Sequence, residues 1–325
     1  MRSSNALADG RMSRKPVAQI RSSHYLRSMG CTFAIGLSLL ASACGYGPAP
    51  SSVASEPAAR SAALSIGALT ARVAAAGDVA CPTALSKPGC RAADTAALVR
   101  RLNPQRVLVL GDLAYDNGSA SEFSNGYAPT WGTFKSKSFP VPGNHEYNTS
   151  GAQPYKDWWG AIAMPSGTTW HSTRLGGWLI LGLDSNCGDS SVGGCGPDSA
   201  QGRWLAAQLR GAPRCVLAIW HHPRRSSGPH GDNASVAPLW QQLANAHADL
   251  VLQGHDHDYE RFAPADAAAN PAKPGMVGMV VGTGGKQLYP IVGRSAGSLV
   301  RVQGVNGVLA LDLHQRGWAW RFTGT

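Results

Sequence analysis

Short apolar runs alternate with polar segments along residues 71–325 and predict a series of buried β-strands. The runs lie at residues 72–77, 106–111, 178–184, 215–220, 249–254 and 276–282. Between some of them, residues 94–102, 199–210 and 236–248 carry apolar side chains at helical spacing. Strands that alternate with helices indicate an α/β fold whose sheet is covered on both faces. Residues 307–324 predict instead an antiparallel hairpin with its turn near Gln315-Arg316-Gly317.

The first 70 residues follow a different pattern. Residues 1–43 combine basic side chains with an apolar segment that ends in Ala41-Ser42-Ala43, which is typical of a secretory signal peptide. The apolar segment is too short for a membrane span, which needs about 20 residues. Cys44 resembles a bacterial lipoprotein processing site, so simple secretion and a lipid anchor at the outer face of the bacterial cell membrane both stay open. Residues 44–70, rich in Ala, Ser and Pro, predict a tether to a catalytic domain at 71–325.

The charge of the chain bears on its partners. The net charge is +10, but the basic leader contributes half of it and the excess over the remaining residues is only +5. This modest, dispersed excess fits small anionic substrates. Without a basic stripe carrying aromatic side chains, the sequence does not indicate nucleic acid as a dedicated partner.

Four cysteines bracket two short loops. Cys81 and Cys90 enclose one loop, and Cys187 and Cys195 enclose the other. Because an exported chain can form disulfides, two local bridges are predicted, although sequence alone cannot fix the connectivity. A cysteine-ligated zinc site is the alternative, and no CxxC pair supports it.

A metal-capable side chain follows four of the predicted strands and the short apolar run at residues 139–142, usually behind a glycine. The residues are Asp78, Asp112 with Tyr115, Asn144, His221, and His255 with His257. Open α/β sheets place their sites at the carboxyl ends of strands, so we expect these side chains to meet there. Oxygen and nitrogen donors without a thiolate suit iron, zinc, manganese or magnesium. Seven donors exceed a tetrahedral zinc site and suit two ions about 3.5–4 Å apart, as in phosphoryl hydrolysis.

The ordered blocks Asp78, Gly111-Asp112-x-x-Tyr115, Gly143-Asn144-His145-Glu146, His221 and Gly254-His255-x-His257 resemble those of the calcineurin-like metallophosphoesterases. Tyr115, three residues after Asp112, and the segment "GHDHDYER" resemble the corresponding motifs of the purple acid phosphatases. The resemblance covers about residues 71–325. It implies a four-layer αββα sandwich, with two mixed β-sheets flanked by helices and the metals at the strand ends.

The resemblance also implies the metals and their ligands. Asp78, Tyr115 and His257 would hold Fe(3+). Asn144, His221 and His255 would hold a divalent ion (Zn, Mn or Fe), and Asp112 would bridge the two ions. A metal-bound hydroxide would attack the phosphorus of a phosphomonoester, as in an acid phosphatase.

Two further histidines are candidate catalytic residues. His145 directly follows Asn144 and is predicted to bind phosphate or to protonate the leaving alkoxide, with Glu146 orienting it. His230 lies nine residues after His221, similar to the substrate-facing histidine of the purple acid phosphatases. The spacing of His255 and His257 predicts that both point to the same side of extended backbone and face the metal pair, one to each ion.

Three other functions are open to the sequence. A phosphodiesterase or nucleotidase would use the same metal site, and the motifs do not separate it from a monoesterase. A surface-anchored binding protein with a decayed site is disfavoured because all seven donors are present. A structural zinc protein is disfavoured by the number of donors.

Overall fold

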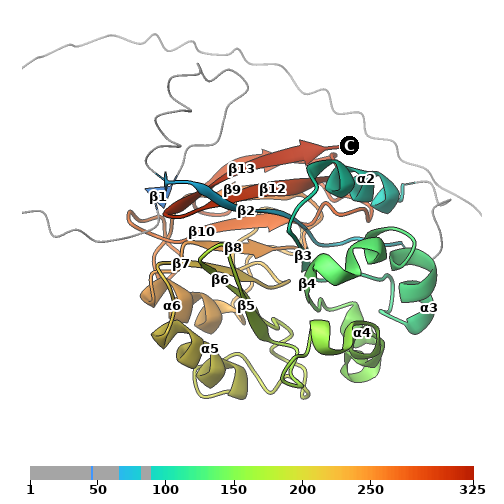
Figure 1. Ribbon diagram of the computed structural model, residues 1–325, viewed down its shortest axis with the longest axis horizontal. Coiled ribbons are helices and arrows are strands. Elements are labelled where there is room, and N and C mark those ends of the chain that lie inside the picture. The colour runs from blue at the N-terminus through green and yellow to red at the C-terminus, as the bar shows by residue number, and fades with distance from the viewer. Residues whose placement is uncertain (1–44, 47–65, 82–88) are drawn as a thin grey trace, which may run out of the picture. The chain divides into compact units, whose positions relative to one another are not determined.

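The structure, a computed structural model, describes residues 45–46, 66–81 and 89–325. The predicted signal peptide and Cys44 lie outside these residues. Two β-sheets form the centre of the described chain (Figure 1). The six-stranded sheet has the order β1 (Gly45–Tyr46), β13 (Gly317–Gly324), β12 (Gly307–His314), β2 (Leu69–Ala76), β3 (Arg106–Leu110), β4 (Ser138–Val141).

The seven-stranded sheet is also mixed. Its order is β11 (Ser298–Val302), β9 (Tyr259–Phe262), β10 (Val277–Val281), β8 (Leu250–Gln253), β7 (Cys215–Ile219), β6 (Trp178–Gly182), β5 (His171–Leu175). Strands β2, β3 and β4 run parallel in one sheet, as do β6, β7, β8 and β10 in the other. All six predicted strands are present, and β12 and β13 form the predicted hairpin. The expectation of two mixed sheets with helices is confirmed.

Both faces of the central strands are buried, which explains their continuous apolar sequences. In β7, Leu217 and Ile219 join the core that also contains side chains of β2, β3 and β12. The intervening Val216 and Ala218 pack instead with Leu205 and Leu239 of the helices outside the sheet. Alternate side chains of β7 point to opposite faces of the sheet. Because both faces pack against apolar side chains, every position of the strand can be apolar.

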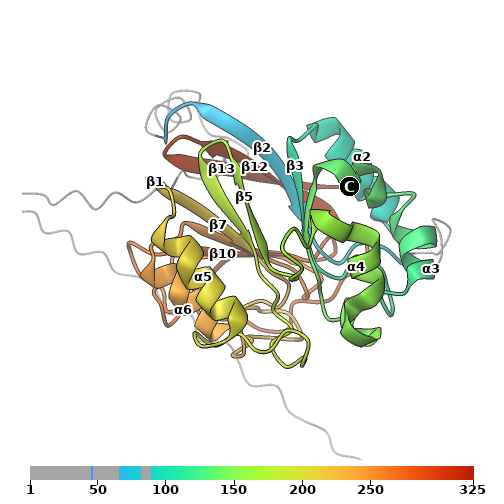
Figure 2. The same cartoon turned by 60° about the horizontal axis from the view of Figure 1, so that its bottom comes forward.

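The predicted helices are α2 (Ala92–Leu102), α5 (Ala200–Arg210) and α6 (Ala237–Asn245). Helices α5 and α6 lie side by side on the outer face of the seven-stranded sheet, whereas α2 lies beside β12 (Figures 1 and 2). Helix α5 begins after Ser199, whose hydroxyl accepts a 2.9 Å hydrogen bond from the Gly202 N–H as an N-cap. Within the described residues, no helix has both the length and the apolar character needed to cross a membrane.

Short helical segments occupy the region between β3 and β5. They are α3 (Ala120–Glu122), a π-helical turn (Phe123–Tyr127), α4 (Gln153–Trp159) and 3-10 turns at Trp131–Lys137, Glu146–Asn148, Ser150–Ala152 and Gly160–Ile162. The two predicted disulfides are present: Cys81 pairs with Cys90, and Cys187 with Cys195. The second bridge closes a loop that follows β6.

Candidate metal centre

The carboxyl ends of strands from both sheets deliver the seven predicted ligand residues to one place. Asp78, Asp112 and Asn144 follow β2, β3 and β4 of the six-stranded sheet. His221 follows β7, and His255 and His257 follow β8, in the seven-stranded sheet. We refer to these six residues together with Tyr115 as the seven-residue site.

Tight backbone turns aim three of these side chains inward. Asp78, Asp112 and His255 have φ angles of 60°, 50° and 75°, a left-handed conformation that non-glycine residues rarely adopt. Such conformations concentrate where a binding site over-determines the backbone. The prediction that His255 and His257 share one side of extended backbone is therefore wrong. His255 turns toward His221 and His257 toward Tyr115, so the pair reaches opposite ends of the site.

The hydroxyl of Tyr115 marks one end of the site. It lies 2.8 Å from Asp78 Oδ1, 3.0 Å from Asp112 Oδ2 and 3.1 Å from His257 Nε2. The His257 ring stacks on Tyr289 with 3.9 Å between centroids, and its Nδ1 contacts the carbonyl oxygen of Gln287. Four elements distant in sequence thus hold these groups together.

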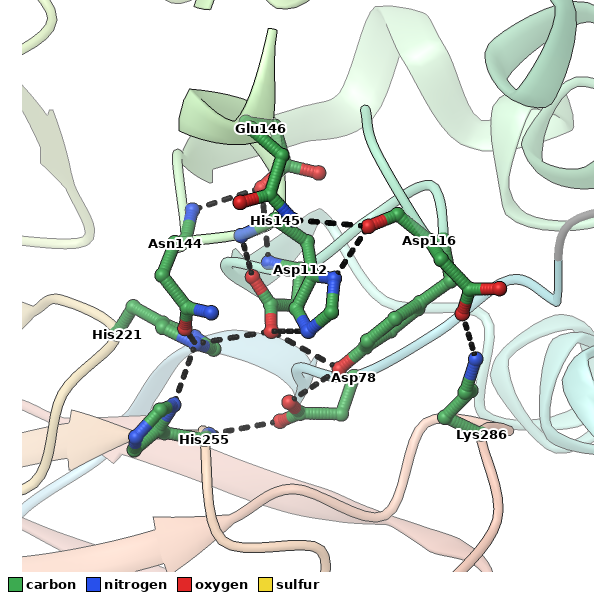
Figure 3. Close-up of polar contacts among 12 residues, drawn as sticks. Asp78, Asp112, Asp116, Asn144, His145, Glu146, His221, His255 and Lys286 are labelled. Atoms are coloured by element: carbon green, nitrogen blue, oxygen red, sulfur yellow. Dashed lines mark hydrogen bonds and ion pairs between the residues drawn. The ribbon is translucent and has the colours of Figure 1, made fainter. Parts of the chain in front are cut away.

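His221 marks the other end. Its Nε2 lies 3.2 Å from Asp112 Oδ2, 3.1 Å from Asn144 Oδ1 and 3.2 Å from His255 Nδ1. Potential ligand atoms of Asp112, His221 and His255 all lie within 4.8 Å of one another. The Asp112 carboxylate contacts both ends, as Figure 3 shows for its position between His145 and His221.

Burial and charge together perturb the ionisation of the site. Burial, followed by the nearby Asp112 and Asp78 carboxylates, raises the pKa of Tyr115 well above its usual value. Burial opposes the charged form of His221, but Asp112 and Asp78 outweigh it and raise the pKa of His221 to about 9. Burial and the neighbouring His221 and His222 lower the pKa of His255. The buried carboxylates of Asp78 and Asp112 therefore favour a positive charge bound between them.

The hydrogen-bond directions test whether metal ions fit. His221 Nδ1 lies 2.8 Å from the Leu110 carbonyl oxygen, which can only accept, so the ring hydrogen is on Nδ1. In the neutral form of the ring, Nε2 presents a lone pair to Asp112 and Asn144 oxygens that also accept, so either a second proton or a cation must lie between these atoms. The same holds for His257, whose Nδ1 faces a carbonyl and whose Nε2 lies 3.3 Å from Asp78 Oδ1. Acceptors that converge in a buried site fit cations, and oxygen and imidazole donors fit iron or zinc.

Sequence comparison agrees with this geometry. The family model of the calcineurin-like phosphoesterases matches residues 71–259, a segment that contains all seven site residues. The chain belongs to this family.

Two relatives share part of its sequence. An uncharacterized protein of Mycobacterium tuberculosis is 29% identical over 212 residues, which cover 54% of this chain and 38% of the relative. The Fe(3+)-Zn(2+) purple acid phosphatase 12 of Arabidopsis thaliana is 26% identical over 186 residues, which cover 49% of this chain and 38% of the relative. The chain thus matches less than half the length of these curated relatives.

Solved structures support the phosphoesterase fold. The purple acid phosphatase PPD1 of yellow lupin seeds aligns with a TM-score of 0.58 at 19% identity, covering 75% of this chain and 49% of that one. GAP50, the anchor in the inner membrane complex of Plasmodium, aligns with a TM-score of 0.58 at 16% identity, covering 79% and 85%. These likenesses show the fold of this calcineurin-like phosphoesterase.

His145 borders the seven-residue site without joining it. Its Nδ1 lies 2.6 Å from the Asp116 carbonyl oxygen, its Nε2 lies 3.8 Å from Asp112 Oδ2, and its ring lies 4.3 Å from that of Tyr115. The side chain is 28% exposed, so a substrate can reach it. Lys286 lies beside the same group, with Nζ paired to Asp116 and 4.2 Å above the Tyr115 ring (Figure 3).

Glu146 does not orient His145 as predicted. Its buried carboxylate accepts hydrogen bonds from the backbone N–H groups of Asp112, Leu113, Ala114 and Gly143. Burial, followed by Asp112, raises the pKa of Glu146 to about 7. Glu146 therefore clamps the turn after β3 to the turn after β4 and fixes the backbone that carries Asp112.

His230 lies at the rim of the site near His255. It is exposed, its ring centroid lies 4.2 Å from that of His255, and its N–H donates to Asp256 Oδ1. His222 faces Ser185, with 2.8 Å between Nδ1 and Oγ. Burial, followed by the nearby His221, lowers the pKa of His222 to about 3.

The remaining acids of the "GHDHDYER" segment contact other partners. Asp256 accepts from the Ser226 hydroxyl, and Glu260 accepts from Ser227 and Ser298. The buried carboxylate of Asp258 has no hydrogen-bond partner within the described chain, and burial, followed by Asp256 and Glu260, raises its pKa to about 8.

Sequence reasoning missed Lys286, Asp116 and the clamp formed by Glu146. A strand-end motif reveals single donors, whereas these residues act through contacts with segments far away along the chain.

Proposed function

We propose that this protein is a dinuclear metal-dependent phosphomonoesterase of the purple acid phosphatase type. Asp78, Tyr115 and His257 would hold Fe(3+). Asn144, His221 and His255 would hold Zn, Mn or Fe in the divalent state, with Asp112 between the two ions. The observation that carries the proposal is the Tyr115 hydroxyl, which lies within 3.1 Å of two carboxylates and an imidazole.

A phenol in this position favours ferric iron over zinc alone. Burial and the two carboxylates keep the Tyr115 proton in place, so a cation must compete strongly to displace it. Two cations held here would supply Lewis acidity toward phosphate oxygens and lower the pKa of water.

The protein's own side chains then position the substrate and move its proton. The Asp116 carbonyl can only accept, so the hydrogen of His145 that it binds is on Nδ1, and Nε2 is the atom that exchanges a proton. His145 Nε2 would bind the phosphate or protonate the leaving alkoxide. His230, beside His255 at the rim, would face the substrate from the other side.

Hydrolysis is supported over a binding role alone. The likeness to GAP50, described as an anchor, shows that this fold also occurs in proteins with that role. In the present chain, all seven donors are retained and converge, and Glu146 and the three left-handed residues hold them in place. A binding surface would not require this arrangement.

We further propose that the protein is exported. The leader at residues 1–43 supports a signal peptide, and Cys44 supports lipid attachment at the outer face of the cell membrane or, without it, secretion. Small phosphorylated molecules outside the cell would be its substrates.

The test is to load the protein with iron and zinc, quantify both metals, record the visible spectrum and assay 4-nitrophenyl phosphate. We expect two ions per chain, a visible charge-transfer band and hydrolysis. Tyr115→Phe should lose the band. A colourless, active protein that contains only zinc or manganese would contradict the purple acid phosphatase type, and a fully loaded protein without hydrolysis would contradict the phosphatase.

A further inference from the structure

An open groove of about 430 Å³ adjoins the candidate metal centre at Asn144. Asn144 belongs to both the groove and the seven-residue site, and His222 lines the groove with its ring centroid 5.1 Å from that of His221. A phosphate held by the site can therefore direct its ester group into this groove. Apart from Asn144, none of the residues that line this groove is a predicted metal ligand.

The groove is lined by carboxamides and hydroxyls. These side chains belong to Asn144, Asn148, Asn186, Asn233, Ser185 and Ser235. Asp189 is the one carboxylate among the lining residues, which include no lysine or arginine. Carboxamides and hydroxyls both donate and accept hydrogen bonds, so they match the hydroxyl groups of an alcohol rather than an anion.

Internal contacts fix these walls before any ligand binds. Asn186 Nδ2 donates to Asp184 and to the Gly143 carbonyl. Asn233 Oδ1 accepts from the N–H and hydroxyl of Ser235, which leaves its NH₂ group to the groove.

Two further contacts hold the loop that follows β6. The Asp189 carboxylate accepts from the N–H and hydroxyl of Ser191. The disulfide of Cys187 contacts the Ser235 carbonyl at 3.6 Å, which joins the loops after β6 and β7. A wall ordered in advance reduces the entropy lost on binding.

We infer that this groove binds the alcohol part of a phosphate monoester and selects a neutral, polyhydroxylated alcohol such as a sugar alcohol. The inference rests on the proposed phosphatase function. An anionic leaving group would meet Asp189 with no cation in the groove to offset it. A purely apolar alcohol would leave the carboxamides without partners.

Two substrates of matched length test the selection. Glucitol 6-phosphate and 6-phosphogluconate differ by one carboxylate, and 4-nitrophenyl phosphate reports activity that does not depend on hydroxyl contacts. For the metal-loaded protein we expect kcat/KM about tenfold higher for glucitol 6-phosphate than for 6-phosphogluconate. Asp189→Asn should narrow this ratio severalfold.

A groove variant and a matched control separate binding from folding. Asn233→Leu should lower kcat/KM for glucitol 6-phosphate about fivefold, the effect of a lost hydrogen bond, and leave that for 4-nitrophenyl phosphate within about twofold. Asn245→Leu, at the exposed end of α6, should change neither value.

The outcomes distinguish the two proposals. Hydrolysis of 4-nitrophenyl phosphate with equal kcat/KM for the neutral and anionic substrates would overturn the groove assignment alone. So would an equal loss on all substrates in Asn233→Leu. Absence of any hydrolysis by the metal-loaded protein would instead refute the phosphatase function on which the groove assignment depends.

Discussion

Lys286 places a cation over the phenol of the candidate metal centre. Its Nζ lies 4.2 Å above the Tyr115 ring and pairs with Asp116, whose carbonyl holds His145. One lysine thus reaches both the tyrosine and, through Asp116, His145, the histidine that we propose exchanges a proton. A positive charge over an aromatic ring stabilises the ring electrons by about 1 kcal/mol.

This contact predicts a spectroscopic change in Lys286→Met. If Tyr115 binds ferric iron, loss of the cation raises the energy of the phenolate electrons. The charge-transfer band should then move to longer wavelength by on the order of 10 nm, the equivalent of about 1 kcal/mol. Lys135→Met provides the control, because Lys135 Nζ lies 4.7 Å over Trp158 rather than over Tyr115. An unmoved band in Lys286→Met would show that Lys286 does not influence the tyrosine.

At the residue scale, the sequence identified the candidate metal ligands but not the residues that hold them in position. Asp112 and Asn144 are recognisable because each follows an apolar strand. The contact of Lys286 with Asp116 joins residues 170 positions apart, and Glu146 acts through backbone N–H groups, which are present at nearly every residue. Neither leaves a local pattern. The left-handed φ of His255 could not be predicted either, because the sequence on both sides of it suggests extended backbone.

Elements differ in how much of their position the sequence reveals. Strands β7 and β8 lie inside the sheet with both faces buried, so their sequences are apolar except for Gln253 at the end of β8. Strands β5 and β11 form the edges of the same sheet and expose several side chains, which removes the signal. The helical segments between β3 and β5 are too short to show a helical period.

An edge strand nevertheless connects the two sheets. His171 of β5 is buried, stacks on Phe139 with 4.1 Å between centroids, and bonds through Nε2 to the Pro140 carbonyl at 2.8 Å. Both partners belong to β4, the edge of the other sheet. Burial lowers the pKa of His171 to about 4, against the opposing effect of this hydrogen bond.

The lowered pKa predicts acid sensitivity at this junction. Protonation of His171 favours the unfolded chain. The neutral imidazole therefore contributes its full stabilisation above the ordinary histidine pKa of 6.5, and this contribution declines as the pH falls toward 4. His171→Gln retains an N–H donor but does not titrate. Between pH 7.5 and 5, urea unfolding of the wild type should lose about 2 kcal/mol more than that of His171→Gln. Parallel pH profiles would show that His171 does not titrate across the transition.

At the scale of the described chain, the candidate metal centre is a further connection between the two sheets. Asp78 and Asp112 come from one sheet, and His221, His255 and His257 from the other, so an ion held by both sets links them. The fold class could be predicted because strand and helix patterns alternate along the chain. That the donors meet could be predicted because each follows the carboxyl end of a strand. The groove beside them could not be predicted, because it is formed by loops that show no sequence pattern.

This connection predicts how metal removal affects stability. A ligand that binds only the folded state at about 100 times its dissociation constant adds about 2.7 kcal/mol. For a domain of this size, that corresponds to a rise in Tm of roughly 5–10 °C. Thermal unfolding of the chelated and the metal-loaded protein measures the difference.

A pair of variants assigns this effect to the metal centre. Asp112→Asn should remove most of the metal-dependent shift, because Asp112 contacts both ends of the site. Asp312→Asn, which breaks the remote ion pair with Arg72 at 2.6 Å, should lower Tm slightly in both states and leave the shift unchanged. If Asp112→Asn kept the full shift, the stabilising ions would be bound elsewhere, and the two sheets would not be linked through this centre.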